Sequence, residues 1–378
     1  MALCSGAPFN FGALSLHFAR AQFAVPQEPQ LEADMNLKTS ALALLLILPT
    51  GAAPAKPSDP SHHDVRFVAV ESDVKLELLD WGGTGRAVVL LAGSGNTAHT
   101  FDEFAPRLLD CCHVYAITRR GYGASTRPAG GYGWRRLADD VFEVIEREHI
   151  PAPVLIGHSM SGGEMTAVGH VHSNRLAGLV YLDALGDLED DPPADTEWSR
   201  LQQALPAGFP PPPPVCVQED RRTFDAFRRS LGCSMRFMFP ESELRQMFEE
   251  ESNGSVGPPT APGWVSRAIG SGQIFRRDYS HIDVPVLALN NGFAPGTTTD
   301  AALKAFGFAP KTTEDRAAID RFMARSAIVF GRWITKLERG VPHPRLVYYP
   351  GAGHYVYFTR EADVLREIHA FIAALPKS

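Results

Sequence analysis

Two serines within the stretch IGHSMSGG are the residues of this chain best placed to supply a nucleophile. The run PVLIG before them has the apolar character of a strand, and MTAVGHVH after them has the pattern of a helix. A sharp strand-to-helix turn around a nucleophile tolerates only small residues two positions before and after it. Gly157 and Ser161 hold these positions around Ser159, and Ser159 and Gly163 hold them around Ser161, so both frames satisfy the pattern.

The length of the strand favours Ser159. The run PVLIGH brings the chain out of the sheet at Ser159, where the first N–H groups of the following helix would face a bound carbonyl oxygen. We therefore expect Ser159 to be the nucleophile, and Ser161 to be a small residue that lets the first helical turn pack.

Three further features, in a suitable chain order, are those that a serine nucleophile needs. The run VVLLAGSGNTAHTFDEF ends a strand in a glycine-rich loop, where the N–H of Ser94 would join that of Met160 in an oxyanion hole. Asp183 ends the strand LVYLDA, and His354 follows the last strand in YYPGAGHYVYF. The histidine would accept the serine proton while the aspartate orients its ring. Taken singly, Asp183 would equally be a helix cap and His354 a buried core histidine.

The segments around these residues alternate between strands and helices. VRFVAV and VKLELLDW predict a hairpin, and six later apolar runs are typical of a parallel sheet buried on both faces. The longest helical pattern covers 314–340, where Thr312 and Asp315 predict an N-terminal cap. The alternation predicts an α/β fold with a mainly parallel central sheet flanked by helices.

The region between Gly186 and about Ile282 interrupts the alternation. It contains no predicted strand, the stiff proline run Pro210–Pro214 and two short amphipathic helices, so we interpret it as an inserted helical cap. We expect most of its large apolar residues to form the cap's own small core, and some of them to line an apolar pocket above the nucleophile. These large apolar residues are Trp198, Phe224, Phe227, Met235, Phe237, Met238, Phe239, Met247 and Phe248.

The first segment has the features of an export signal. Met35 begins a stretch with one lysine and a short apolar run, followed by the small residues Ala53-Pro54-Ala55 of a cleavage site. The apolar run is too short to span a bilayer, which takes roughly 20 residues. We expect a secreted or periplasmic protein with no stable membrane anchor, and we interpret residues 1–34 as an extension before the true start.

Export changes what the cysteines are expected to do. Cys216 and Cys233 bracket one short helix of the cap, and in an oxidising compartment they would form a disulfide. The adjacent Cys111 and Cys112 are expected to be buried thiols.

The composition excludes some classes of partner. The chain has 378 residues, 44 % of them hydrophobic and 21 % charged, and a formal net charge of −7. This mild acidity, with no basic stripe carrying aromatic residues, gives no indication of a nucleic-acid partner. No Cys/His group has zinc-ligand spacing, and His62 and His63 lie in a polar lead-in where we expect them to be solvated. We expect neither a metal nor a cofactor.

Several stretches resemble those of capped α/β-hydrolase-fold serine hydrolases of the esterase- and haloperoxidase-like branch. They are LLAGSGNTAHTFDEFAPRL, ITRRGYGAS, LIGHSMSGGE, LVYLDA and GAGHYVY, and the resemblance runs from about Val65 to Leu375. With it, the expected organisation is an extension (1–34), a signal peptide (35–55), a linker (56–64), a hydrolase core (65–186 and 283–378) and a cap (187–282). Ser161 stands where the turn of the family usually ends in glycine.

The acid is a second departure from the family pattern. In most members it follows the strand after the cap, but that loop here holds Asn290 and Asn291 and has no carboxylate before Asp300. Some members take the acid from the end of the strand after the nucleophile, where Asp183 lies. We favour Asp183 and keep Asp300 as the alternative.

The resemblance implies a cofactor-free serine hydrolase that forms an acyl-enzyme on small-molecule esters with small or medium apolar groups. A serine nucleophile argues against haloalkane dehalogenase and epoxide hydrolase activity, for which similar proteins use aspartate. Two alternatives stay open. One is acyl transfer or cofactor-free perhydrolysis on the same triad, and the other is an inactive ligand-binding homologue.

Overall fold

The computed structural model describes residues 62–186, 197–210, 216, 218–272 and 277–376. The extension and signal peptide expected at 1–55 lie outside the described residues, as does most of the proline run. None of the described helices is long and apolar enough to cross a membrane.

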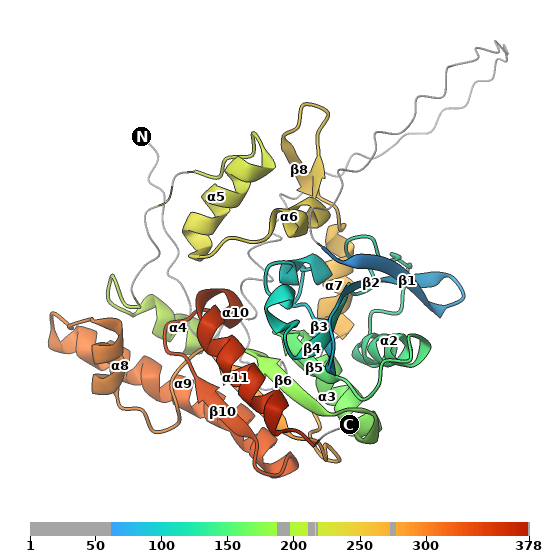
Figure 1. Cartoon of the computed structure of the whole chain (residues 1–378). Helices are drawn as coiled ribbons and strands as arrows, with labels where there is room; N and C mark the ends of the chain where they lie inside the picture. Colours follow the sequence, from blue (N-terminus) through green and yellow to red (C-terminus); the bar gives the residue numbers. More distant parts are fainter. Residues whose placement is uncertain (1–61, 187–196, 211–215, 217, 273–276, 377–378) are drawn as a thin grey trace, which may run out of the picture.

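An eight-stranded sheet forms the centre of the fold, in the order β1-β2-β4-β3-β5-β6-β9-β10 (Figure 1). The strands are β1 (Asp64–Glu71), β2 (Val74–Gly82), β3 (Arg86–Leu91), β4 (Cys112–Ile117), β5 (Val154–His158), β6 (Gly178–Leu182), β9 (Val286–Asn290) and β10 (Arg345–Tyr348). β1 and β2 form the expected antiparallel hairpin. The other six strands of this sheet run parallel to one another, in the order β4, β3, β5, β6, β9 and β10. The predicted α/β fold is therefore confirmed.

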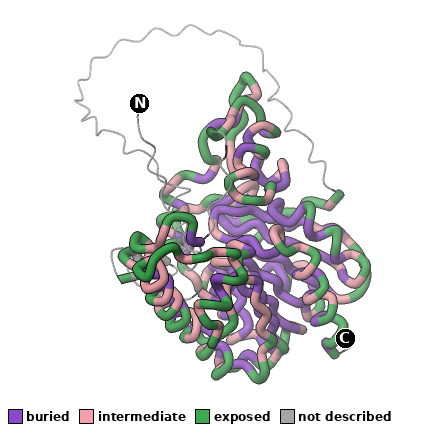
Figure 2. Tube along the Cα trace, turned by 90° about the vertical axis from the view of Figure 1, so that its left-hand side faces the viewer, coloured by how far each residue is buried: buried purple, intermediate pink, exposed green. Residues whose placement is uncertain are grey.

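Alternate residues of the central strands face two separate cores, one on each side of the sheet. Figure 2 shows that buried residues fill the centre of the molecule. In β3, Val88 and Leu90 face one core, while Val89 and Leu91 face the other. Since both faces are covered, the strands need apolar residues at every position, which explains their near-continuous hydrophobic runs.

Helices cover the two faces. The core that contains Val89 also packs α2 (Trp134–Arg147), α3 (Ser161–His172) and α9 (Thr313–Gly340). The other core packs η1 (Ala98–Phe101), η2 (Ala105–Leu108), α10 (Val356–Thr359) and α11 (Glu361–Ala374). Before β6 lies the short η3 (Ser173–Arg175), and before α9 lies α8 (Thr299–Phe306). The N-terminal capping predicted for the long helix α9 is confirmed, because Thr312 and Asp315 form a reciprocal capping box.

The segment between β6 and β9 carries the predicted helices and a small sheet. Its helices are α4 (Glu197–Gln203), α5 (Phe224–Met235), α6 (Glu241–Met247) and α7 (Gly263–Gly272). The expectation of no strand here is wrong, since β7 (Phe248–Glu250) pairs with β8 (Val256–Pro259). Strands of three and four residues are too short to show a clear alternation in sequence. In Figure 1, α5, α6 and β8 lie together at the top of the molecule.

The disulfide predicted between Cys216 and Cys233 is present, with Cα atoms 5.7 Å apart. The expectation of two thiols at Cys111 and Cys112 is wrong, because the structure joins them in a second disulfide. Cys111 belongs to the turn before β4, so the alternation of a strand does not separate the two side chains.

The expectation that His63 is solvated is also wrong. Its side chain is only 1 % exposed, and its ring packs edge-on against Trp81 with centroids 5.0 Å apart. The pairing of β1 with β2 carries the lead-in back onto the body of the protein.

Candidate active site

Ser159 occupies a strained turn between β5 and α3. Its φ is +57°, in the left-handed region that non-glycine residues rarely adopt. The Ser159 N–H donates to the Leu182 carbonyl at 3.2 Å, and the Ser159 carbonyl accepts from the Gly162 N–H at 3.0 Å. A Cβ on Gly93 would lie 3.2 Å from that of Ser159, so the neighbouring loop needs a glycine there. This is the geometry expected of a nucleophile turn.

Ser161 lies in a different environment. It is fully buried, and its hydroxyl hydrogen bonds to the carbonyls of Leu91 at 3.1 Å and His158 at 2.8 Å. Those contacts direct the Ser161 hydroxyl into the sheet, whereas Ser159 is half-buried at the strand end. The assignment of the nucleophile to Ser159 remains a prediction, and this geometry agrees with it.

The structure brings His354 to Asp183. His354 Nδ1 lies 2.7 Å from Asp183 Oδ2, and Asp183 follows β6 with a φ of +47°. Asp183 Oδ1 accepts the Asn291 N–H at 2.9 Å, and Asn291 Oδ1 accepts the Gly353 N–H at 3.1 Å. Asn291 therefore joins the loop of the acid to the loop of the histidine.

Asp300, the alternative acid, lies elsewhere. It begins α8 with 77 % of its side chain exposed, and it pairs with Arg316 at 2.6 Å. The geometry therefore favours Asp183 as the partner of His354.

His158 links the serine turn to the histidine loop. Its Nε2–H donates to the His354 carbonyl at 3.1 Å, and the two rings lie with centroids 4.5 Å apart. Burial, and then the neighbouring His354, lower the pKa of His158 well below its ordinary value, so the ring is neutral. The residue before Ser159 thus fixes where His354 sits relative to the serine.

Arg119 and Glu164 connect the segments that carry the two proposed oxyanion donors, Ser94 and Met160. Ser94 lies in the loop after β3, and Met160 precedes α3. Arg119 donates to the carbonyls of Ala92 at 2.9 Å and Gly93 at 3.2 Å, and pairs with Glu164 of α3 at 2.5 Å. Burial alone would lower the pKa of Arg119, but Glu164 raises it, so the guanidinium stays charged, while burial raises the pKa of Glu164 against the opposing effect of Arg119.

Comparison with known proteins identifies the family. The sequence model of the Alpha/beta hydrolase family matches residues 88–367. This chain belongs to that family. A non-heme chloroperoxidase of Streptomyces lividans is 25 % identical over 291 residues, covering 72 % of this chain and 90 % of that protein. The bifunctional esterase/perhydrolase DCH of Acinetobacter calcoaceticus is 28 % identical over 127 residues, covering 32 % of this chain and 45 % of that protein.

Solved structures agree on the fold. The crystal structure of E-2-(acetamidomethylene)succinate hydrolase superposes with a TM-score of 0.55 over 83 % of this chain and 100 % of that one, at 19 % identity. With the family match and the related hydrolases, the prediction of an α/β-hydrolase enzyme is confirmed.

A buried glutamate of the hydrolase connects α6 to the loop that follows β3 and carries Ser94. Glu243 accepts hydrogen bonds from Asn96 Nδ2 at 2.8 Å and the Thr97 N–H at 3.1 Å, and also from the Thr97 hydroxyl. Asn96 Oδ1 in turn accepts from the Tyr355 hydroxyl at 3.0 Å, beside His354. Burial raises the pKa of Glu243 to about 7, against the opposing effect of these donors.

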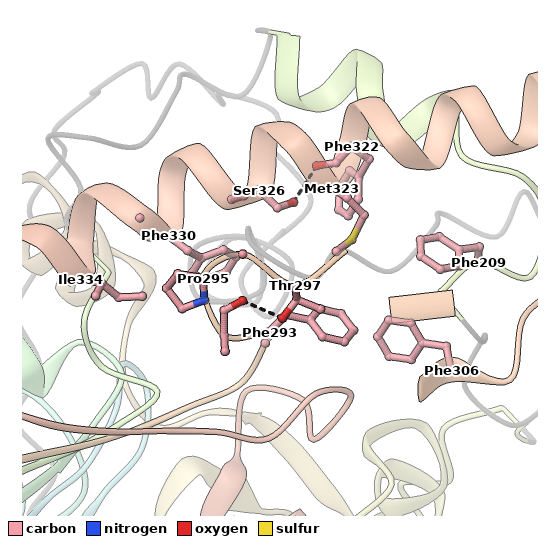
Figure 3. A pocket seen from close by; sticks show the side chains of 15 residues that line it. Phe209, Phe293, Pro295, Thr297, Phe306, Phe322, Met323, Ser326, Phe330 and Ile334 are labelled. Carbon is pink, nitrogen blue, oxygen red and sulfur yellow. Dashed lines mark hydrogen bonds between the residues drawn. The ribbon is translucent and has the colours of Figure 1, made fainter. Parts of the chain in front are cut away.

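Two pockets of the hydrolase have lining residues next in sequence to residues of this site. One, of about 440 Å³, begins at Gly95 beside Ser94 and is lined by Tyr122, Met247 and Phe248. The other, of about 660 Å³, begins at Gly292 directly after Asn291, and aromatic side chains from α8, α9 and Phe209 point into it (Figure 3).

The large apolar residues of the cap divide between core and pocket, as expected. Met247 and Phe248 line a pocket, and Phe224, Phe227 and Phe239 are buried, although in the core that also contains the strands rather than in a core of the cap alone. Met238 is 47 % exposed, and the side chain of Trp198 lies outside the described residues. Apart from Phe209, the aromatic lining of the larger pocket follows β9, a region that the sequence did not connect with substrate.

Proposed function

We propose that this hydrolase is an exported serine esterase that cleaves small or medium apolar carboxylic esters. Ser159 is the nucleophile, His354 the general base and Asp183 the orienting acid. The observation that carries the proposal is the 2.7 Å contact between His354 Nδ1 and Asp183 Oδ2, beside a serine in a strained turn. Export rests on the signal expected at 35–55 and on the Cys216–Cys233 disulfide.

The chemistry follows from the residue types. His354 Nδ1–H donates to Asp183, which leaves Nε2 to accept the Ser159 proton as Oγ attacks the ester carbonyl. The oxyanion then faces the N–H groups of Ser94 and Met160. His354 returns the proton to the leaving alcohol, an acyl-enzyme remains, and water repeats the sequence to release the acid.

The same steps assign the two pockets. The leaving oxygen must lie near His354 to be protonated. We therefore expect the alcohol group to extend toward the larger pocket, which Gly292 lines. The carbonyl oxygen of the ester must face the N–H of Ser94. We therefore expect the acyl chain to extend toward the smaller pocket, which Gly95 lines. Both linings are mainly apolar, which supports a preference for apolar groups.

A panel of aryl esters with acyl chains from acetyl to hexanoyl tests the function, run on wild type and Ser159→Ala. Each buried methylene contributes about 0.8 kcal/mol, or about fourfold in kcat/KM. We expect a rise along the series and no turnover by the variant. A flat profile with an active Ser159 would show that the acyl pocket is not apolar, and amide or lactone turnover alone would replace the ester assignment.

Paired variants test the pocket assignment. Met247→Ala is expected to flatten the acyl-chain profile and leave the alcohol profile unchanged, because Met247 lines the pocket beside Gly95 and not the larger one. Phe306→Ala is expected to do the reverse. Reversed effects would exchange the two pockets.

Perhydrolysis is the second candidate, favoured by the names of the relatives. One is a bifunctional esterase/perhydrolase and another a non-heme chloroperoxidase. The same acyl-enzyme would pass its acyl group to hydrogen peroxide in place of water. Peracid formation from acetate and peroxide that exceeds ester hydrolysis would make this the main activity.

A further inference from the structure

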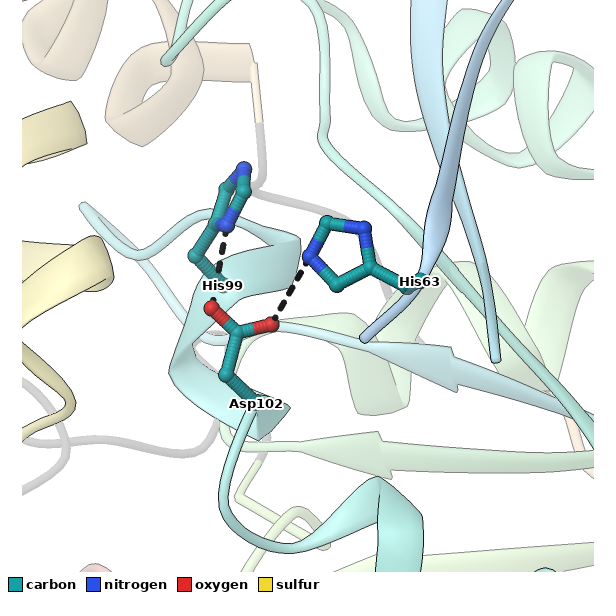
Figure 4. A group of neighbouring side chains, drawn as sticks. All are labelled: His63, His99 and Asp102. Carbon is teal, nitrogen blue, oxygen red and sulfur yellow. Dashed lines mark hydrogen bonds and ion pairs between the residues drawn. The ribbon is translucent and has the colours of Figure 1, made fainter. Parts of the chain in front are cut away.

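A buried cluster of three side chains lies outside the proposed catalytic site (Figure 4). His63 precedes β1, His99 belongs to η1 and Asp102 ends η1. His63 Nε2 lies 3.3 Å from Asp102 Oδ1, and His99 Nδ1 lies 3.1 Å from Asp102 Oδ2. One ligand atom from each of the three residues lies within 4.8 Å of the others. Segments far apart in sequence thus place two imidazoles around one carboxylate.

These separations are close to those of a tetrahedral metal site, although the two histidines face different oxygens of Asp102. Zinc binds histidine nitrogen and carboxylate oxygen at about 2.0–2.2 Å, so tetrahedral ligand atoms lie about 3.3 Å apart. The side chains of His63, His99 and Asp102 are only 1 %, 2 % and 4 % exposed. The three residues would supply three ligands, leaving one position for water.

A second carboxylate, that of Glu77, lies beside the other ring nitrogen of His99. His99 Nε2 lies 3.5 Å from Glu77 Oε1, and Glu77 is fixed by the Thr118 hydroxyl at 2.6 Å. Metal-binding histidines commonly have a carboxylate beside their other ring nitrogen, which orients the ring and strengthens the ligand, and Glu77 lies at ion-pair distance from this nitrogen of His99. The Ser242 hydroxyl similarly donates to Asp102.

The charges of the cluster also suit a divalent cation. The ion pairs that the structure describes for Asp102 and Glu77 are all with His63 or His99. Two buried carboxylates facing two imidazoles are balanced by one divalent cation bound to neutral rings, or by a proton on each ring.

We propose that His63, His99 and Asp102 form a structural binding site for a divalent transition metal of the zinc class. Two nitrogen donors disfavour magnesium and calcium, which prefer oxygen ligands. The metal would fasten the segment before β1 to η1, which directly follows the loop that carries Ser94. It takes no part in the proposed ester chemistry, so the test does not depend on hydrolysis.

Metal binding by the untagged mature chain tests the proposal. After treatment with a chelator and its removal, we expect one equivalent of Zn²⁺ at micromolar free metal, and a melting temperature several degrees higher with zinc than without. Co²⁺ in place of zinc is expected to give the visible absorption of a tetrahedral site. No binding, with the two imidazoles protonated instead, would overturn the proposal, and the wild-type titration alone decides this.

Matched variants locate the ion. His63→Ala and Asp102→Asn are expected to lose the bound metal and the zinc-dependent rise in melting temperature. His62→Ala removes the adjacent, exposed histidine and is expected to bind as wild type does. His369→Ala tests the other group of close ligand types, Asp110, Cys111 and His369. Metal that persists in His63→Ala, or that is lost in His369→Ala alone, would contradict the site.

Discussion

The buried carboxyl of Glu243 is expected to make stability depend on pH, and Glu243→Gln should remove that dependence. A glutamine can keep the contacts of the neutral acid, since its oxygen accepts from Asn96 and the Thr97 N–H while its amide faces the Thr97 hydroxyl. The comparison therefore isolates the charge of Glu243 from its shape.

The magnitude follows from the raised pKa. The folded state holds the pKa of Glu243 at about 7, against an ordinary value of 4.5. Because the folded pKa is the higher one, this group contributes its stability fully below about pH 4.5 and loses it as the pH rises through about 7. The difference corresponds to about 3 kcal/mol in the free energy of unfolding.

Urea unfolding of wild type and variant from about pH 4.5 to about pH 8 measures this effect, because groups common to both proteins cancel in the difference. We expect similar stabilities at the acid end and a variant about 3 kcal/mol more stable at the alkaline end. Glu241→Gln is the control, since Glu241 lies on the same helix, is 40 % exposed and pairs with Arg245. A wild-type-to-Glu243→Gln difference that does not change with pH would refute the reasoning.

Three further predictions concern the site and the cap. Asp183→Asn is expected to lower turnover by up to about 10⁴-fold, as loss of the orienting carboxylate does in serine proteases, while Asp300→Asn stays near wild type; the reverse in steady-state kinetics would make Asp300 the acid. Ser161→Ala should stay active but lose about 1 kcal/mol in urea unfolding, since its hydroxyl bonds only to backbone carbonyls; an inactive, fully folded variant would contradict this. Cys216→Ala with Cys233→Ala should cost about 3 kcal/mol at most, and peptide mapping of wild type that finds both thiols free would reject the disulfide.

The fold and most of the candidate site can be predicted from the sequence alone. Buried parallel strands are apolar throughout, so β3, β5, β6 and β9 can each be recognised in the sequence. Ser159, Asp183 and His354 each follow such a strand, and the carboxyl ends of parallel strands meet at one edge of the sheet. Their proximity could therefore be predicted without a structure.

The residues that position the site were not predictable in the same way. Arg119 with Glu164, and Glu243 with Thr97, are pairs whose members lie 45 and 146 positions apart in sequence. A charged residue in a sequence is usually solvated, and only tertiary packing shows that these are buried. The same reason accounts for His63, whose polar neighbours suggested solvent.

The covalent adduct of a fluorophosphonate probe tests the central claim most directly. The reagent labels an activated serine, so mass spectrometry of the digested protein identifies the nucleophile without knowledge of the substrate. If Ser159 is the nucleophile, we expect one adduct, on Ser159, that disappears in Ser159→Ala and persists in Ser161→Ala. An adduct on Ser161, or a folded wild type that is not labelled at all, would contradict it.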